Sequence, residues 1–258
     1  MEEREIFLGD LKINYKIAGQ GPAILILHGW GGSSDSWVEV SHLLAKNGFR
    51  IIFPDLPGFG KSLTPYSPWG LEDYSNFILK FTQKLNLEKF FLLGHSFGGR
   101  VAIKFAYLHP EKIKCLILCD SAGIKIKPSF KSKIILLIAK IGNAIFGLNH
   151  LKRFKDQMRN LFYLFLRNKD YVRASETMKK TMKKILKEDL SREIKEIKLR
   201  TLILWGENDK MVPLKYAYFF KENIKDSRLI IFPKVGHSPH LEVPQELAKE
   251  IYQFLKQC

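Results

Sequence analysis

The 258-residue sequence predicts an α/β protein with a doubly wound, mostly parallel central sheet flanked by helices, and a helical cap inserted before the last two strands. Apolar runs alternate with helical patterns over residues 9–120, which is the order of consecutive βα units. Several runs are apolar throughout, as strands are when helices cover both faces of a parallel sheet. Residues 125–198 show only helical periodicity, and strand patterns then resume.

The first part of the chain contains short runs rich in strand-forming residues and bounded by Gly, Pro or Asp: 12–17, 23–27, 50–54, 90–93 and 115–119. Helical patterns lie between the later runs, around 36–46, 72–85 and 100–108. We therefore expect the first half of the sheet to be built from these segments.

The middle of the chain shows helical periodicity over 134–145, 150–166 and 169–186. Strands follow at 201–205 and 228–232, and a helix at 245–256. The simplest account is a core domain of residues 1–122 and 199–258 with a cap, 123–198, inserted between two strands. Such an insertion would cover the carboxyl edge of the strands, where the sites of α/β proteins lie.

Composition excludes several classes of protein. A hydrophobic content of 46%, spread evenly, indicates a packed globular chain. The first five residues are acidic and lack an apolar core, so they do not resemble a secretory signal. The longest apolar stretch, 134–148, is interrupted by Lys140, Gly142 and Asn143, so no transmembrane segment is expected.

The three cysteines indicate a reducing, cytoplasmic location. Cys115 and Cys119 lie on one predicted strand, roughly 13 Å apart. This separation is too long for a disulfide between them. Cys258 is the last residue of the sequence.

The net charge of +16 is concentrated in the predicted cap. Residues 121–190 contain 17 Lys and Arg against 5 Asp and Glu, a net charge of +12. One interpretation is a lysine-rich composition on solvated helix faces. The other is a basic surface for an acidic partner, an anionic substrate or an anionic membrane. No nucleic-acid-binding motif accompanies the charge, so a nucleic-acid partner is not expected.

The most informative motif is Gly94-His95-Ser96-Phe97-Gly98, a G-x-S-x-G run between a predicted strand and a predicted helix. In this context the pattern indicates a nucleophile elbow. The turn is so sharp that the serine has strained backbone geometry and the positions two before and two after it need glycine. Ser96 would thereby be raised out of the sheet.

A serine nucleophile needs a base, and the base needs an orienting acid. For an elbow serine these follow in the order acid, then histidine. Asp209 follows the predicted strand 201–205, and His237 follows the predicted strand 228–232. Asp209 would hold the imidazole of His237, which would take the proton of Ser96 and pass it to the leaving group.

Each of these choices has a rival. His95 adjoins the serine, but neighbours on a sharp turn point apart, so we interpret it as structural. His240 is interpreted as a surface or loop histidine. Glu207 could replace Asp209, although it stands closer to the strand, where packing usually claims the side chain. Asp120 is the strongest alternative acid, because it ends a core strand from which it could reach the histidine.

Developing negative charge requires an oxyanion hole. The backbone N–H of Phe97, the residue after the nucleophile, is one expected donor. The second is the N–H of Trp30, in the glycine-rich loop 28–33 that follows a predicted strand. An ordinary tight turn is the simpler interpretation of that loop, and a phosphate cradle is disfavoured because no G-x-x-x-x-G-K-[ST] is present.

Together these motifs resemble the α/β-hydrolase fold superfamily over essentially the whole chain. They are HGWGGS at 28–33, DLPGFGKS at 55–62, GHSFGG at 94–99, GEND at 206–209 and GH at 236–237. The pattern is similar to capped serine hydrolases, which include carboxylesterases of small esters, carbon–carbon bond hydrolases of ring-cleavage products and pimeloyl-carrier-protein methyl esterases. The resemblance implies that Ser96 is the nucleophile, Asp209 the acid and His237 the base. It also implies that Trp30 and Phe97 are the oxyanion donors. Serine at the elbow disfavours the haloalkane dehalogenase and epoxide hydrolase branches.

The leading hypothesis is a hydrolase that uses neither cofactor nor metal and cleaves a small-molecule carboxylic ester through an acyl-enzyme. Apolar residues of the cap would line an acyl pocket or pack on the core: Ile134, Leu137, Ile141, Phe162 and Phe165. One alternative is an esterase or thioesterase whose basic cap docks an acidic acyl-carrier protein or an anionic substrate. Further alternatives are a carbon–carbon bond hydrolase, a lid that binds a lipid surface, and a non-catalytic receptor on the same fold.

Overall fold

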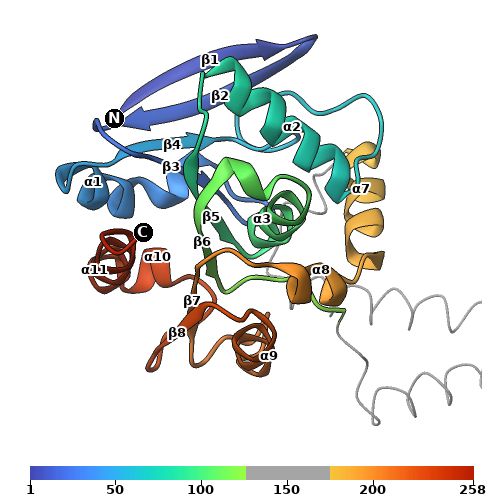
Figure 1. Ribbon diagram of the computed structural model, residues 1–258. Coiled ribbons are helices and arrows are strands. Elements are labelled where there is room, and N and C mark those ends of the chain that lie inside the picture. The colour runs from blue at the N-terminus through green and yellow to red at the C-terminus, as the bar shows by residue number, and fades with distance from the viewer. Residues whose placement is uncertain (126–174) are drawn as a thin grey trace, which may run out of the picture. The chain divides into compact units, whose positions relative to one another are not determined.

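The computed structural model contains an eight-stranded sheet with the strand order β1-β2-β4-β3-β5-β6-β7-β8 (Figure 1). The structure describes residues 1–125 and 175–258. The strands are β1 (Glu2–Leu8), β2 (Leu11–Ala18), β3 (Ala23–Leu27), β4 (Arg50–Pro54), β5 (Phe90–His95), β6 (Ile113–Cys119), β7 (Thr201–Gly206) and β8 (Ser227–Phe232). From β4 to β8 every neighbouring pair is parallel, whereas β1, β2 and β4 pair antiparallel. The predicted mostly parallel α/β sheet is confirmed.

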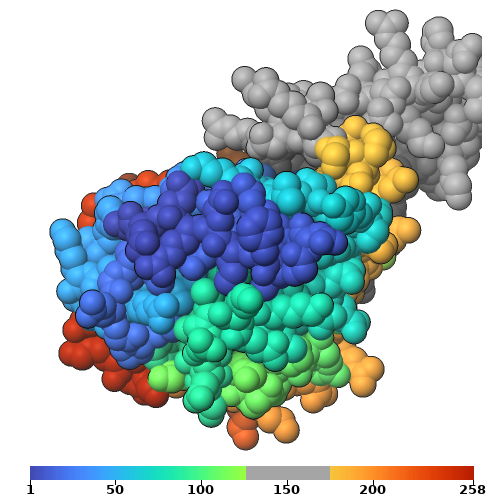
Figure 2. Space-filling model, turned by 90° about the horizontal axis from the view of Figure 1, so that it is seen from above, coloured from blue at the N-terminus to red at the C-terminus, as the bar shows by residue number. Residues whose placement is uncertain are grey.

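Strand β1 was not predicted, because its sequence EEREIFL is charged and its residues are exposed or half-buried. It forms one edge of the sheet and pairs with β2 from Glu2↔Ile17 to Leu8↔Leu11. Figure 2 shows these N-terminal strands, in dark blue, on the surface of the molecule. Charged side chains on an edge strand hinder pairing with another chain.

Helices cover both faces of the sheet. The α-helices are α1 (Val38–Lys46), α2 (Leu71–Lys84), α3 (Phe97–Leu108), α7 (Glu176–Lys187), α8 (Ser191–Glu196), α9 (Lys215–Asn223), α10 (Pro239–Glu242) and α11 (Pro244–Leu255). Short 3-10 helices span Ser34–Trp37 and Pro110–Lys112. Figure 1 shows α1 and α11 on one face and α2, α3 and α9 on the other. Helix α9 had not been predicted. The described helices are too short or too polar to cross a membrane.

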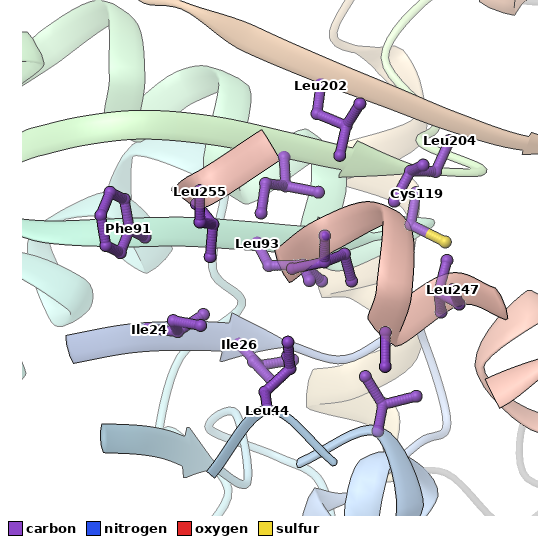
Figure 3. Close-up of a cluster of buried hydrophobic side chains, with 14 of the residues drawn as sticks. Ile24, Ile26, Leu44, Phe91, Leu93, Cys119, Leu202, Leu204, Leu247 and Leu255 are labelled. Carbon is purple, nitrogen blue, oxygen red and sulfur yellow. The ribbon is translucent and has the colours of Figure 1, made fainter. Parts of the chain in front are cut away.

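The core beneath α1 and α11 shows why the strands are apolar throughout. Side chains on one face of β3, β5, β6 and β7, such as Ile26, Leu93 and Leu204, pack against these two helices, which contribute Leu44 and Leu247 (Figure 3). Alternate residues of the same strands, such as Leu92, are equally buried on the opposite face. A strand that is covered on both sides has no solvent-facing position for a polar residue.

Helices α7 and α8 are the described end of the connection between β6 and β7. Met1–Ile124 and Ser175–Cys258 form one compact unit, which includes both helices, and Lys125–Ala174 form a second unit. The buried guanidinium of Arg100, on α3, donates through Nη2 to the carbonyl of Ile185 at 2.8 Å and to that of Glu188. This contact fixes the end of α7 to the helix that follows Ser96. The apolar cap residues predicted at 134–165 lie outside the described residues.

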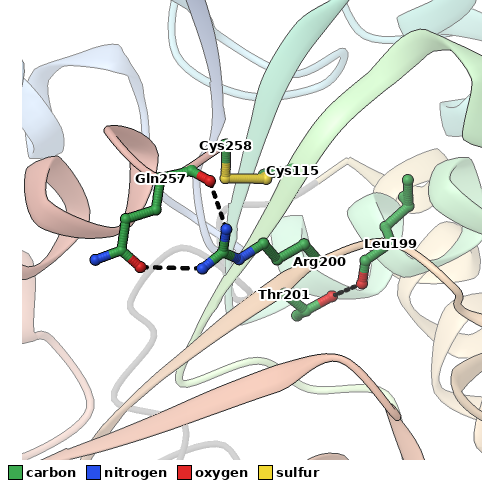
Figure 4. Close-up of a disulfide and its surroundings, with 6 residues drawn as sticks. All are labelled: Cys115, Leu199, Arg200, Thr201, Gln257 and Cys258. Carbon is green, nitrogen blue, oxygen red and sulfur yellow. Dashed lines mark hydrogen bonds between the residues drawn. A yellow bond between two sulfur atoms is a disulfide. The ribbon is translucent and has the colours of Figure 1, made fainter.

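The structure corrects the interpretation of the cysteines. Cys115, on β6, forms a disulfide with Cys258, while Cys119 is free and buried (Figure 4). Beside the disulfide, Arg200 donates to the main-chain carbonyl of Gln257 and to its Oε1. Spacing along a strand excludes a disulfide between Cys115 and Cys119 only, since it says nothing about where the end of the chain lies. The support that cysteine content gave to a reducing cytoplasm is therefore removed.

Candidate active site

Ser96 occupies the sharp turn between β5 and α3 in the strained geometry that its sequence context predicts. Its φ is +52° and its ψ is −111°, a conformation that non-glycine residues rarely adopt. Its N–H donates to the carbonyl of Cys119 at 3.1 Å, and its own carbonyl accepts from Ala122 at 3.1 Å. These bonds to the end of β6 and the residues after it hold the strained turn in place.

The two glycines of the elbow are required by close packing. A Cβ on Gly94 would lie 2.5 Å from the carbonyl oxygen of Gly98. A Cβ on Gly98 would lie 2.2 Å from the carbonyl oxygen of Leu27, at the end of β3. Either contact is far inside van der Waals distance, so any larger residue would push α3 away from the sheet.

A continuous chain of hydrogen bonds joins Ser96, His237 and Asp209. The Oγ of Ser96 lies 2.9 Å from Nε2 of His237, and Nδ1 of His237 lies 2.7 Å from Oδ2 of Asp209. The side chain of Asp209 is fully buried and that of His237 is 13% exposed. Because a carboxylate only accepts, Nδ1 carries the proton and Nε2 is free to accept the hydroxyl proton.

Asp209 is held by its own loop after β7. Its Oδ1 accepts from the backbone N–H of Met211 at 2.7 Å and of Val212 at 2.9 Å. These bonds leave Oδ2 directed at His237 and fix the orientation of the carboxylate.

Three hydrogen bonds hold the loop that carries His237. Glu242, on α10, accepts from the N–H of Gly236 at 2.8 Å and of Ser238 at 3.2 Å, the two neighbours of His237. The carbonyl of His237 accepts from Nε2 of His95 at 2.8 Å. Sequence reasoning missed Glu242. A carboxylate six residues after a loop glycine, at the end of a one-turn helix, gives no distinctive pattern.

Two of the alternative residues, His240 and Glu207, differ in burial from what was predicted. His240 is only 4% exposed, and its ring stacks on Trp37 at 4.5 Å, so its interpretation as a surface or loop histidine was wrong. Burial lowers the pKa of His240 to about 3. Glu207 is exposed rather than claimed by packing, and its Oε2 accepts from the N–H of Lys234 at 3.0 Å. His95 is buried, and its Nε2 is bonded to the carbonyl of His237, in line with its structural interpretation.

Asp120 lies beside the hydrogen-bonded chain, next to Asp209. Carboxyl oxygens of Asp120 and Asp209 and a ring nitrogen of His237 all lie within 4.8 Å of one another. Such a group of ligand atoms could hold a metal ion, but both nitrogens of His237 are already used by Ser96 and Asp209. The geometry is that of a proton-transfer chain.

The residues predicted as oxyanion donors flank the serine. Phe97 begins α3, so its N–H belongs to the first turn of a helix, where N–H groups have no intrahelical acceptor. Trp30 follows Gly29, at which a Cβ would lie 3.3 Å from the Cβ of Ser96. The rings of Trp30 and Phe97 contact each other at 5.3 Å. The donor roles of both residues remain predictions.

Comparisons with known proteins agree with the fold. The profile of the alpha/beta hydrolase fold family matches residues 22–244. A 2-hydroxy-6-oxononadienedioate/2-hydroxy-6-oxononatrienedioate hydrolase of Pseudomonas putida is 28% identical over 266 residues, covering 95% of this chain and 92% of the relative. A 2-hydroxy-6-oxo-6-phenylhexa-2,4-dienoate hydrolase of Burkholderia cepacia is 29% identical, with coverage of 89% and 86%.

A solved structure gives the same result. The serine hydrolase involved in carbazole degradation superposes with a TM-score of 0.77 at 27% identity, covering 100% of this chain and 99% of that one. The profile match spans most of the sequence and includes the elbow, the Asp209 loop and His237. The chain therefore belongs to the alpha/beta hydrolase fold family.

Proposed function

We propose that this protein is a serine hydrolase in which Ser96 is the nucleophile, His237 the general base and acid, and Asp209 the orienting acid. The observation that carries the proposal is the unbroken chain from Ser96 Oγ through His237 to Asp209, at 2.9 and 2.7 Å. A hydroxyl, an imidazole and a buried carboxylate in this order activate serine toward a carbonyl carbon.

The reaction then has two halves. Ser96 Oγ bonds to the carbonyl carbon while its proton moves to Nε2 of His237, and the backbone N–H groups of Trp30 and Phe97 stabilise the oxyanion. The tetrahedral intermediate collapses, the bond to the leaving group breaks, and His237 delivers the proton to that group. Water attacks the acyl-enzyme by the same steps, which releases a carboxylic acid and restores Ser96.

The leaving group distinguishes the two substrate classes. A carboxylic ester loses an alcohol, which is an oxygen leaving group. It needs less stabilisation from the site than a carbon leaving group does. The relatives named as hydrolases of 2-hydroxy-6-oxo-dienoates favour a second candidate, in which the bond that breaks joins the substrate carbonyl carbon, attached to Ser96 Oγ, to a carbon of the leaving group. Such dienoates are carboxylates, and the net charge of +16 suits an anionic substrate.

The insertion between β6 and β7 is the proposed source of selectivity. We propose that residues 123–198 form the cap and residues 1–122 and 199–258 the core. The described end of the cap carries exposed lysines on α7: Lys180, Lys183, Lys184 and Lys187. Docking of an acidic acyl-carrier protein on this basic segment would depend on charge, so its contribution to the rate would fall as salt is added.

The experiment compares 4-nitrophenyl acetate with 2-hydroxy-6-oxo-6-phenylhexa-2,4-dienoate, each with and without added salt. We expect Ser96→Ala and His237→Ala to abolish hydrolysis, while the exposed Ser67→Ala variant retains it. A fluorophosphonate probe should label the wild-type protein at Ser96. Turnover in Ser96→Ala similar to wild type, or an unlabelled Ser96, would contradict the proposal and favour a receptor.

A further inference from the structure

Asp120 is a buried carboxyl group that the reaction described above does not use. It directly follows β6, is 0% exposed and has a φ of +41°. In the described part of the chain no Lys, Arg or His forms an ion pair with it. A buried carboxylate with no countercharge is costly, so this group requires a physical explanation.

The contacts of Asp120 tie it to β7, the strand that leads to the Asp209 loop. Its backbone N–H donates to the carbonyl of Leu204 at 2.9 Å, and its Oδ1 accepts from the N–H of Gly206 at 2.9 Å. The thiol of Cys119 lies 3.6 Å from its Oδ2. Asp120 is thus fixed within 4.8 Å of a carboxyl oxygen of Asp209.

The two carboxyl groups differ in how many donors they receive. Asp209 accepts from the N–H groups of Met211 and Val212 and from Nδ1 of His237, so its charge is well stabilised. Asp120 accepts one backbone N–H and one weak thiol contact. When two carboxyl groups share a dry site, one of them keeps its proton, and the poorer acceptor site is that of Asp120.

We propose that Asp120 is a further positioning residue of this site: its neutral carboxyl group donates a hydrogen bond to the Asp209 carboxylate and holds that carboxylate in line with His237. The inference rests on the proposed function for its effect on turnover. Its claim about the proton on Asp120 is independent of turnover.

The electrostatics of the surroundings agree with this arrangement. Burial, followed by the charge of Asp209, raises the pKa of Asp120 well above its usual value. The titratable groups that face it are Cys119 at the end of β6, Asp209 on the loop after β7 and His237 on the loop after β8. Burial also raises the pKa of Cys119, so that neighbour stays a neutral thiol.

The matched variant is Asp120→Asn, because asparagine tolerates a positive φ and its amide can donate the same hydrogen bond. We expect the variant to keep kcat for 4-nitrophenyl acetate within about threefold of wild type, with the acidic limb of kcat/KM unmoved. If Asp120 were ionised, removal of its charge would move that limb to lower pH by about one unit, which would overturn the proposal.

Asp120→Ala removes the donor altogether. We expect kcat to fall by about tenfold or more with little change in KM, because the Asp209 carboxylate loses one of the groups that orient it. If Asp120→Asn keeps kcat and Asp120→Ala loses it, the side chain acts as a hydrogen-bond donor and not only as packing. Equal activities and equal pH profiles for the two variants would show a structural role only and would overturn the proposal.

Infrared difference spectroscopy tests the proton directly and needs no activity. The wild-type protein at pH 7 should show the C=O stretch of a buried, protonated carboxylic acid that is missing from Asp120→Asn. Absence of this band overturns the proposal even if Asp120→Ala fails to fold. Presence of the band together with no Ser96-dependent hydrolysis would contradict the proposed function and leave the neutral Asp120 established.

Discussion

His95 donates from Nε2 to the main-chain carbonyl of His237 at 2.8 Å, so the residue before the proposed nucleophile holds the loop of the proposed base. The His95 ring also contacts the ring of His240 at 4.6 Å, and His240 stacks on Trp37. Both histidines are buried, and burial lowers the pKa of each. His95 and His240, which pack behind the proposed site, are therefore neutral imidazoles.

This cluster makes stability depend on pH. The pKa of His240 is about 3 in the folded protein, below the value of about 6.5 in an unfolded chain. The unfolded state therefore binds the proton first, and the stability that neutral His240 contributes is present above pH 6.5 and lost as the pH falls. His240→Phe should keep the stacking on Trp37 and remove this loss, which is about 1 kcal/mol per pH unit. Urea unfolding of the wild type and His240→Phe at pH 7.5 and pH 5 measures this difference. Equal pH dependence of the unfolding free energy in the two proteins would contradict the prediction.

Asp209→Asn tests which acid orients His237. The amide can donate to Nδ1 and so stabilise the wrong tautomer, and we expect kcat to fall by roughly 10⁴-fold while KM changes little. Glu207→Gln is the matched control, since Glu207 is exposed on the same loop. Its kcat should stay near that of wild type. A large loss in Glu207→Gln with a small one in Asp209→Asn would reverse the assignment.

The mostly parallel sheet and the residues brought to its carboxyl edge were predictable because both depend on local patterns. The strand order, with β4 between β2 and β3, was not predicted. Apolar runs indicate strands covered on two sides, and a G-x-S-x-G run indicates a strained turn. The choice of Asp209 over Asp120 was a weaker inference. It depended on which carboxylate accepts the hydrogen bond of His237. In the structure Nδ1 of His237 lies 2.7 Å from Oδ2 of Asp209.

The features that were missed depend on contacts between distant segments. The burial of His240 follows from Trp37, about two hundred residues away in the sequence, on which its ring stacks. Strand β1 has no apolar face and forms because β2 offers a free edge. The partner of Cys115 lies 143 residues further along the chain. Contacts between segments so far apart leave no hydrophobic periodicity or motif spacing in the sequence from which they could be predicted.

Gly98→Ala should destabilise the protein strongly, because its Cβ would lie 2.2 Å from the carbonyl oxygen of Leu27. Backbone on both sides of the contact cannot rotate away, so we expect a loss of roughly 3 kcal/mol or failure to fold. Gly70→Ala is the control: its φ is −100°, and the nearest atom, Oε1 of Glu188, is 3.3 Å away on a flexible side chain. Its cost should stay below about 1 kcal/mol in chemical denaturation. Similar losses in both variants would show that close packing at the elbow is not the cause.

Arg100→Met should weaken the attachment of α7 to α3. The substitution leaves the carbonyls of Ile185 and Glu188 without the donor that they have in the structure, and we expect a loss of about 2 kcal/mol in equilibrium unfolding. Arg192→Met, at an exposed position of α8, is the control and should change stability by less than about 0.5 kcal/mol. A destabilisation of Arg192→Met as large as that of Arg100→Met would count against the contact.

The disulfide between Cys115 and Cys258 takes up two of the three thiols in the chain. Under denaturing, non-reducing conditions, thiol titration should detect one cysteine, Cys119, of the three in the chain. After reduction it should detect all three. Detection of three thiols without reductant would show that the bond does not form.

Removal of this bond should lower stability through the unfolded state. The disulfide joins residues separated by 143 positions, so it restricts a large loop in the unfolded chain. We expect Cys258→Ser to lose about 2–4 kcal/mol in urea unfolding. The wild-type protein provides its own control: a reductant should bring it to the stability of Cys258→Ser and should leave that variant unchanged. If the reductant destabilises the two proteins equally, the loss comes from another effect, because Cys258→Ser has no disulfide to reduce.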